Sequence, residues 1–205
     1  MKKSVSLILV LCMILLLVGC NSENVPDKDP EPTRGVIEGD IYTNEYLGFT
    51  FTKQESWIYS TDEEIAALMN IGAEMLGEKF TEALKNNPTV YDMMAIDTLT
   101  GSSVNIGYEN LSKTFSSNIT VEQYIEVLKN QISSIATSGI AITFPDEFDV
   151  VTFGDTDFTR VIATTSMNGF SLTQVYYLNK ADGFMRFIIV TAMDNNIERI
   201  EAMFE

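Results

Sequence analysis

The chain has 205 residues, of which 45% are hydrophobic, and its 13 basic and 29 acidic residues give a formal charge of −16 at pH 7. It contains no histidine, which excludes Ser-His-Asp triads, histidine-ligated zinc sites and imidazole acid–base catalysis. Because a strongly negative field repels phosphate backbones, we expect no nucleic-acid partner.

The first 19 residues have the three parts of a secretory signal peptide. Lys2 and Lys3 form a basic start, an almost wholly apolar stretch runs from Val5 to Val18, and the small residue Gly19 closes it. The apolar stretch is shorter than the roughly 20 residues of a transmembrane helix, and no stop-transfer charges follow it. We therefore expect residues 1–19 to be a cleaved leader.

The end of the leader, Leu17 to Cys20, resembles the lipobox of bacterial lipoproteins, in which the cysteine is lipidated and cleavage occurs in front of it. The resemblance implies lipidation at Cys20, with acyl chains such as palmitate holding the protein on the extracytoplasmic face of the cell membrane. The alternative is an ordinary secretory peptide with an incidental cysteine. Because Cys12 leaves with the leader, the lipidated domain would have no free thiol and no disulfide.

Residues 20–38 are predicted to form the lipidated cysteine and a flexible tether, because prolines and acids dominate this stretch, typical of an extended, disordered segment: Pro26, Asp27, Asp29, Pro30, Glu31 and Pro32. Loss of the two leader lysines leaves eleven basic and 29 acidic residues, a formal charge of −18. Residues 39–205 are enough for one domain with a sizeable core.

In the first half of the domain we expect two strands, a long helix and two further strands. Strands at 41–46 and 49–52 flank Gly48, and Trp57 follows as a core anchor. A capping box from Thr61 to Glu64 starts a helix that ends before Pro88, and its apolar stripe contains Ile65, Leu68, Met69, Gly72, Met75, Leu76, Phe80 and Leu84. Strands at 91–98 and 104–108 come next.

In the second half we expect two helices around a series of strands. Thr120 and Gln123 form a capping box, and the helix behind it turns inward Val121, Tyr124, Ile125, Leu128, Ile132 and Ile135. Strands at 148–153, 158–167, 170–178 and 184–192 are linked by the turn pairs Gly154-Asp155, Asn168-Gly169 and Asp182-Gly183. A last helix, capped near Asp194, presents Ile197, Ile200 and Phe204. This order predicts an α+β fold, an antiparallel β-sheet with helices packed on it.

Residues Tyr42 to Phe51, followed by Trp57, resemble the opening hairpin of PsbP-like lipoproteins of Gram-positive bacteria, and the strand order after them agrees. That family is named for an extrinsic subunit of photosystem II. Where its members often have a proline before the tryptophan, this chain has residues 53–56, Lys-Gln-Glu-Ser. The resemblance implies an α/β/α sandwich and an extracytoplasmic accessory or binding role. It offers no catalytic signature to transfer, and no photosynthetic function follows from it.

Carboxylates remain as candidate catalytic or metal-binding groups. Paired acids can cleave glycosidic bonds when the surroundings keep one of them protonated. Asp62, Glu63 and Glu64 lie in a first helical turn, where acids stabilise free N–H groups. A second group could supply oxygen ligands to calcium, although it lacks EF-hand spacing and is also explained as solvated turn acids: Asp146, Glu147, Asp149, Asp155 and Asp157.

The other motifs are better explained by structure than by chemistry. Ser102 and Ser103 lie in a turn, without a Gly-x-Ser-x-Gly elbow or a Ser-x-x-Lys pair. Four methionines could form an adaptable contact surface or a soft-metal site, but their places on helix and strand faces favour core filling: Met69, Met75, Met93 and Met94. Asn118-Ile119-Thr120 matches a glycosylation sequon and is interpreted as a helix N-cap. We predict no catalytic residue, metal ligand or cofactor.

These features favour a membrane-anchored extracytoplasmic lipoprotein that acts as a non-enzymatic binding or accessory module for another envelope protein. The alternative is a small-ligand or calcium-binding surface lipoprotein that uses the acidic loops between Asp146 and Asp157. A carboxylate-based hydrolase would need two facing, partly buried carboxylates in a cleft.

Overall fold

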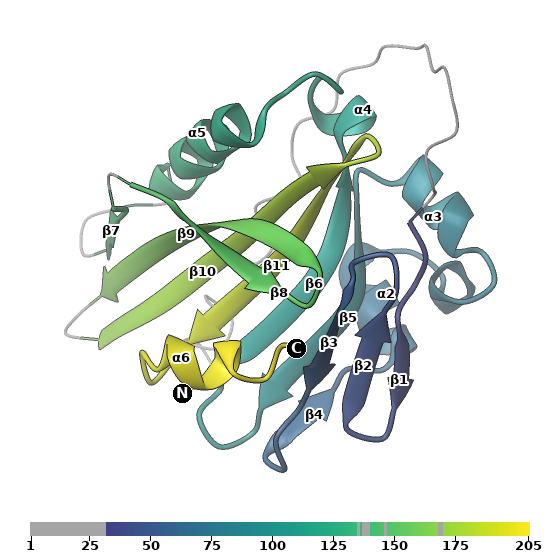
Figure 1. The fold of residues 1–205 in the computed structure, drawn as a ribbon, viewed down its shortest axis with the longest axis horizontal. Helices are drawn as coiled ribbons and strands as arrows, with labels where there is room; N and C mark the ends of the chain where they lie inside the picture. Colours follow the sequence, from purple (N-terminus) through teal and green to yellow (C-terminus); the bar gives the residue numbers. More distant parts are fainter. Residues whose placement is uncertain (1–31, 135, 137–139, 146, 168–169) are drawn as a thin grey trace.

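The computed structural model describes residues 32–134, 136, 140–145, 147–167 and 170–205. At its centre is an eight-stranded antiparallel sheet with the order β4-β5-β6-β11-β10-β9-β7, in which β8 also pairs with β9 (Figure 1). Its strands are β4 (Trp57–Tyr59), β5 (Thr89–Asp97), β6 (Ser103–Asn110), β7 (Ile140–Thr143), β8 (Asp149–Phe153), β9 (Thr156–Met167), β10 (Phe170–Ala181) and β11 (Phe184–Ala192).

A second, smaller antiparallel sheet contains β1 (Val36–Glu38), β2 (Ile41–Asn44) and β3 (Phe49–Thr52) in that order. The end of the chain extends this sheet, because Phe51 of β3 forms a bridge with Phe204 and the Thr50 N–H donates to the carbonyl of Glu205 at 2.8 Å.

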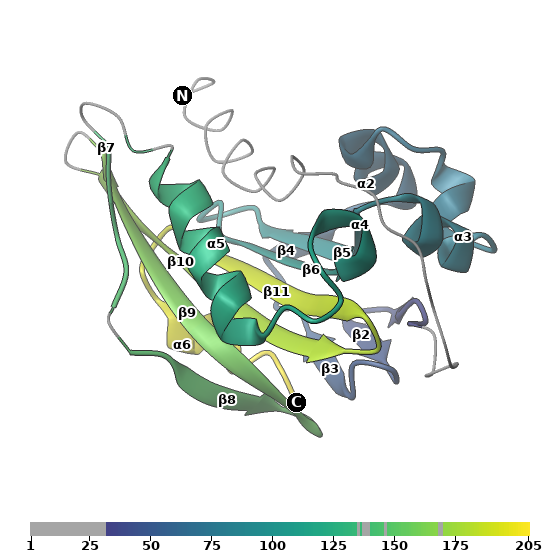
Figure 2. The same ribbon diagram turned by 90° about the horizontal axis from the view of Figure 1, so that it is seen from above.

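Helices and the small sheet cover opposite sides of the large sheet. The helical segments are α2 (Asp62–Met69), the 3₁₀ turn η2 (Ala73–Leu76), α3 (Phe80–Asn86), α4 (Leu111–Thr114), α5 (Val121–Ser133) and α6 (Ile197–Glu201). Figure 2 shows α2, α3, α4 and α5 on one side of the large sheet and β2, β3 and α6 on the other. The predicted α+β class, an antiparallel sheet with helices packed on it, is confirmed. None of the described helices is long and apolar enough to cross a membrane.

The local signals in the sequence lie where they were expected. Thr61 with Glu64 and Thr120 with Gln123 form capping boxes at the starts of α2 and α5. Asp182 and Gly183 adopt φ of 54° and 80°, the positive values that a type I′ turn needs. Trp57 is fully buried, and it packs beside a cluster of aromatic rings in which Phe153 stacks on Phe204 at 4.6 Å.

The long helix predicted from Thr61 to Leu84 is wrong, because the structure divides it into α2, η2 and α3. Asn70 takes a left-handed conformation with φ of 55° and ends α2. The apolar stripe continues across the break because both following turns also pack against the sheet, with Leu76, Phe80 and Leu84 buried. The last helix is capped by Asn196, while Asp194 accepts a bond from the Asn196 N–H.

The structured domain begins before its expected start at residue 39. Pro32 is buried, residues 33–35 contact the core, and Val36 to Glu38 form β1, so the segment predicted as the end of the tether is part of the fold. The predicted leader, Cys20 and the rest of the tether lie outside the described residues. So do the predicted turn Asn168-Gly169 and the predicted inward residue Ile135.

Candidate functional site

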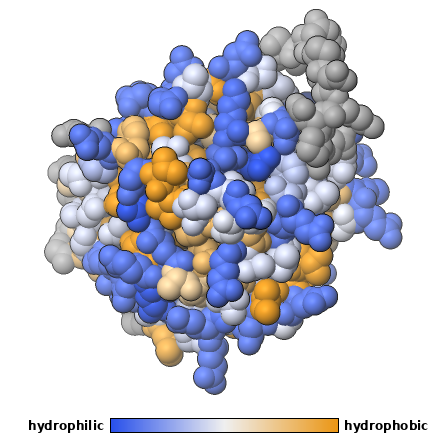
Figure 3. Space-filling view, in the orientation of Figure 1, coloured by the Kyte–Doolittle hydropathy of each residue, from blue (hydrophilic) through white to orange (hydrophobic). Residues whose placement is uncertain are grey.

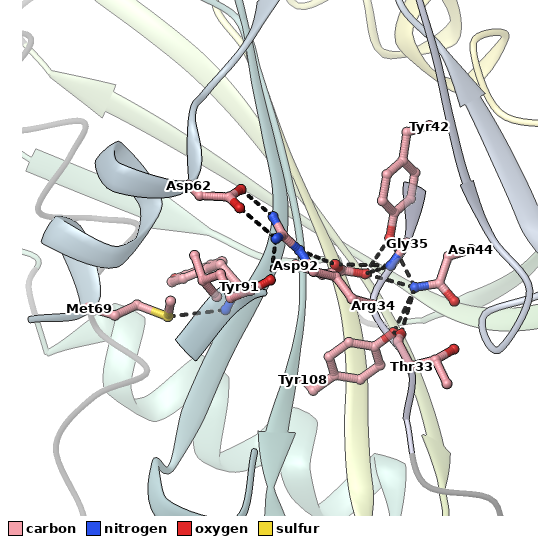
Figure 4. A network of polar contacts seen from close by, with 11 residues as sticks. Thr33, Arg34, Gly35, Tyr42, Asn44, Asp62, Met69, Tyr91, Asp92 and Tyr108 are labelled. Carbon is pink, nitrogen blue, oxygen red and sulfur yellow. Dashed lines mark hydrogen bonds and ion pairs between the residues drawn. The ribbon is translucent and has the colours of Figure 1, made fainter. Parts of the chain in front are cut away.

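A bulge in β5 points one carboxylate toward the small sheet. The register between β5 and β6 shifts between Tyr91 and Met93, so that Asp92 has no partner residue on β6. Bulges commonly redirect a side chain in this way. The carboxylate of Asp92 consequently meets residues of β2 and of the segment before β1 (Figure 4).

Three donors converge on this carboxylate. The Tyr42 hydroxyl donates to Oδ2 at 2.6 Å and the Asn44 amide donates to the same oxygen at 2.7 Å. The Gly35 N–H lies 3.0 and 3.2 Å from the two oxygens. The Asn44 amide also lies 2.9 Å from the hydroxyl of Tyr108. Since Asp92 is 2% exposed, its oxygens are occupied by protein groups rather than by solvent.

Arg34 connects this network to the first turn of α2. Its guanidinium donates to both oxygens of Asp62, at 2.8 and 2.5 Å, and to the carbonyl of Leu76. Its Nε lies 3.6 Å from Oδ1 of Asp92. We call Thr33, Arg34 and Gly35, together with Asp62 and Asp92, the N-terminal clasp. It fixes the segment that follows the predicted tether to β5 and α2.

Burial governs the electrostatics of the network. Burial raises the pKa of Asp92, against the opposing effects of its hydrogen bonds and of Arg34. Burial also raises the pKa of Tyr42 and Tyr108 well above the ordinary tyrosine value. Arg34 instead lowers the pKa of the more exposed Asp62 through their hydrogen bonds. With Tyr42, Asn44 and Tyr108 all closed to solvent, the network has the character of a structural joint.

Other buried or half-buried acids are also bound to neighbouring elements, among them Glu109 and Glu201. Glu109 of β6 is 1% exposed and accepts a 2.5 Å bond from the Tyr124 hydroxyl of α5, and burial raises its pKa. Glu201 of α6 accepts bonds of 2.7 Å from the Tyr177 hydroxyl and from Arg160. These acids join a helix to the sheet in each case.

The acids singled out in the sequence serve caps and ion pairs. Asp62 belongs to the N-terminal clasp, and Glu64 accepts from the Thr61 N–H at 2.9 Å as part of the capping box. Glu63 is exposed in the same first turn. The structure therefore supports the interpretation that these three acids stabilise the start of a helix.

The structure does not bring the described members of the proposed calcium-ligand group together. Asp149 forms an ion pair with Arg160, and Asp157 accepts a 2.7 Å bond from Thr152. The Asp155 N–H donates to the Gly48 carbonyl in a turn, while Glu147 is exposed. Among the described residues there is no group of three or more histidines, cysteines or acids that could hold a metal ion. Asp146 lies outside the described residues.

The remaining candidates occupy structural positions. The Ser102 hydroxyl accepts from Thr100 at 2.9 Å and from the Met193 N–H at 3.1 Å, which fixes the β5–β6 turn, and Ser103 begins β6. Met93 is fully buried, and Met69, Met75 and Met94 pack against the core. Thr120 caps α5, as the interpretation of the sequon expected.

The face of the domain seen in Figure 3 is mostly hydrophilic, with separate apolar areas. In Figure 3, orange side chains gather over the region of β8 and β9 and again near β1 and β2. The most exposed large hydrophobic residues of the described chain, from several parts of the fold, are Val36, Ile58, Leu99 and Val150.

No protein-family model and no curated protein matches the chain. Among solved structures, it is similar to cyanobacterial PsbP (CyanoP) from Synechocystis sp. PCC 6803, with a TM-score of 0.48 and 8% sequence identity over 86% of this chain and 94% of that one. A similarity of this degree concerns the fold, and it says nothing about the partners or activity of this chain.

Proposed function

We propose that the protein is a lipoprotein, anchored through Cys20 to the extracytoplasmic face of the cell membrane, whose domain acts as a non-enzymatic binding or accessory module for another envelope protein. The observation that carries the proposal is the enclosure of the buried acids. Asp92, Asp97 and Glu109 are closed to solvent and bound to residues of the fold, so none of them can act on a substrate without local unfolding.

The N-terminal clasp supports the anchored part of the proposal. Arg34 and Gly35 attach the chain that follows the tether to Asp62 and Asp92. A force on the tether would therefore be transmitted to β5 and α2 rather than to a flexible terminus. Such an attachment suits a domain that is held at a membrane while it binds another protein.

In-cell crosslinking of the full-length protein tests the proposal, followed by membrane fractionation and mass spectrometry. We expect the protein in the membrane fraction, joined to another envelope protein, and we expect Cys20→Ala to move it out of that fraction. A chain of residues 1–38 controls for contacts made through the anchor alone. Unchanged fractionation of Cys20→Ala would contradict the anchor, and full-length protein without any protein adduct would contradict the binding role.

A further inference from the structure

One end of the domain exposes a group of apolar side chains around β4. Ile58 of β4 and Ile96 of β5 are paired in the sheet register, so both lie on the same face. They are 53% and 41% exposed, and Leu99 in the turn after β5 is 83% exposed. Single exposed hydrophobic residues are ordinary, whereas neighbouring ones indicate an interaction surface. We call Ile58, Ile96 and Leu99 the β4 patch.

The surroundings of the β4 patch are held in place. The Ser56 carbonyl accepts from the N–H and the hydroxyl of Thr98, at 2.9 and 2.8 Å, which joins the loop before β4 to the turn after β5. Between them lies an open hollow of about 480 Å³, lined by Gln54, Glu55, Ser56, Thr98 and Leu99. The surface is thus formed before any partner binds, which lowers the entropic cost of binding.

The charge around the β4 patch is mainly negative. Lys53, beside β4, lies 5.9 Å from the centre of the Tyr59 ring and forms an ion pair with Asp40. No lysine or arginine occurs between Lys53 and Lys79 or between Lys85 and Lys113, the two stretches that contain β4, α2, β5 and β6. The first stretch contains six acids, of which five are exposed: Glu55, Glu63, Glu64, Glu74 and Glu78.

Basic residues from other segments lie near β4 and α2, where they form ion pairs with acids. Arg34 binds Asp62, and Arg199 lies 3.4 Å from Asp97 and 3.2 Å from Asp194. Arg199 also donates to Gln54 in the lining of the hollow, at 3.2 Å. Exposed Val150 of β8, in contrast, follows Asp149, which forms an ion pair with Arg160. The β4 patch therefore has an acidic rim, and the basic residues that reach it are paired with acids.

We propose that the β4 patch docks a basic segment of another protein, one that also carries apolar side chains. This inference rests on the proposed function and adds the surface and the chemistry of the partner. Apolar side chains of the segment would cover Ile58, Ile96 and Leu99, while its lysines and arginines would meet Glu55 and Glu63. The same rim repels anionic lipid headgroups and a second copy of this acidic chain, because like charges oppose association.

Site-specific photo-crosslinking in cells tests the proposal with the full-length chain. A benzophenone side chain replaces Leu99, and the same group at exposed Ser117, between α4 and α5, is the positional control. We expect Leu99 to capture an envelope protein at a segment rich in lysine and arginine. The double variant Glu55→Lys with Glu63→Lys should reduce the adduct about tenfold, because it reverses the steering charge. Glu45→Lys with Glu147→Lys makes the same change of charge elsewhere and should leave the yield unchanged.

Each outcome decides between the two proposals. Capture of an envelope protein at Ser117 but not at Leu99 would overturn the β4 patch proposal and leave the binding role standing. Adducts at Leu99 with lipid alone, with a second copy of the chain or with a segment that has no excess of basic residues would also overturn it, as would equal losses in the two charge-reversed pairs. Absence of protein adducts at both positions and in chemical crosslinking would remove both proposals. Circular dichroism of each variant checks that the fold is intact.

Discussion

Replacement of Asp92 by alanine should destabilise the domain strongly. The change removes the acceptor of the Tyr42 hydroxyl and of the Asn44 amide, both buried, and leaves Arg34 with one carboxylate instead of two. A buried donor without an acceptor costs about 1–3 kcal/mol. Asn44 retains the Tyr108 hydroxyl as a neighbour, so the total loss is about 3–5 kcal/mol, as for other broken buried charge networks.

Urea denaturation measures this loss. If the free energy of unfolding falls by about 2 kcal/mol per molar urea, the unfolding midpoint of Asp92→Ala should be about 2 M lower than that of the wild type. Asp62→Ala is the matched control, because it removes the other carboxylate that Arg34 contacts but from a side chain that is 43% exposed. Its cost should be about 1 kcal/mol or less. Equal midpoints for the two variants would refute the reasoning that the buried end of the clasp carries most of its stability.

The Asp92→Asn variant separates hydrogen bonding from charge. Burial raises the pKa of Asp92 in the folded state. The stability gained from its protonation is therefore complete below the unfolded pKa of 3.8 and is lost as the pH rises through the folded pKa. Asparagine cannot titrate, so the variant should lose less stability than the wild type between pH 4 and pH 7. A pH series of urea midpoints with parallel slopes for both proteins would contradict the raised pKa.

Two further predictions concern other parts of the domain. Burial raises the pKa of Glu109, so its contribution to the stability of the fold is lost as the pH rises. Arg160 lowers the pKa of Asp149, so the contribution of Asp149 to stability is lost as the pH falls. Stability should therefore peak at mildly acidic pH, and a monotonic rise of the melting temperature from pH 4 to pH 8 would contradict this. Thr120→Ala should lower the free energy of unfolding by about 1 kcal/mol in thermal unfolding, because it removes the N-cap of α5. Asn118→Ala should be nearly neutral. Similar losses in the two variants would show that the effect of Thr120 does not come from capping.

The elements that the sequence predicted well depend on short-range chemistry. The capping boxes at Thr61 and Thr120 and the turn at Asp182-Gly183 are each defined within four residues, and the structure contains all of them. Six strands of the large sheet, β5, β6 and β8 to β11, were also predicted, because alternating apolar residues mark them. The short strands β4 and β7 were not predicted. The break at Asn70 was missed, since the apolar stripe continues through the 3₁₀ turn and gives no sign that the backbone has left the helix.

The N-terminal clasp could not be predicted for a different reason. Arg34 follows a run of prolines and acids, so the sequence predicts it as part of the tether. Asp92 interrupts an apolar strand, and the sequence does not indicate on which face of the sheet its side chain lies. Its direction depends on the bulge, which is a property of the pairing between β5 and β6 rather than of either strand alone. The available signal was a polar residue, Asp92, in a buried strand and a basic residue, Arg34, in an acidic segment. That signal does not show that these two residues lie close together.

The clasp and the β4 patch together restrict where a partner could lie. Arg34 meets Asp62 in the same turn of α2 that carries Glu63, so the chain enters the fold beside the acidic rim. From Cys20 to Pro32 the chain can span about 40 Å at most, since a fully extended residue covers roughly 3.3–3.6 Å. A lipid on Cys20 would therefore keep the rim near the membrane surface. Under the two proposals, the docked segment would then also lie near the membrane surface.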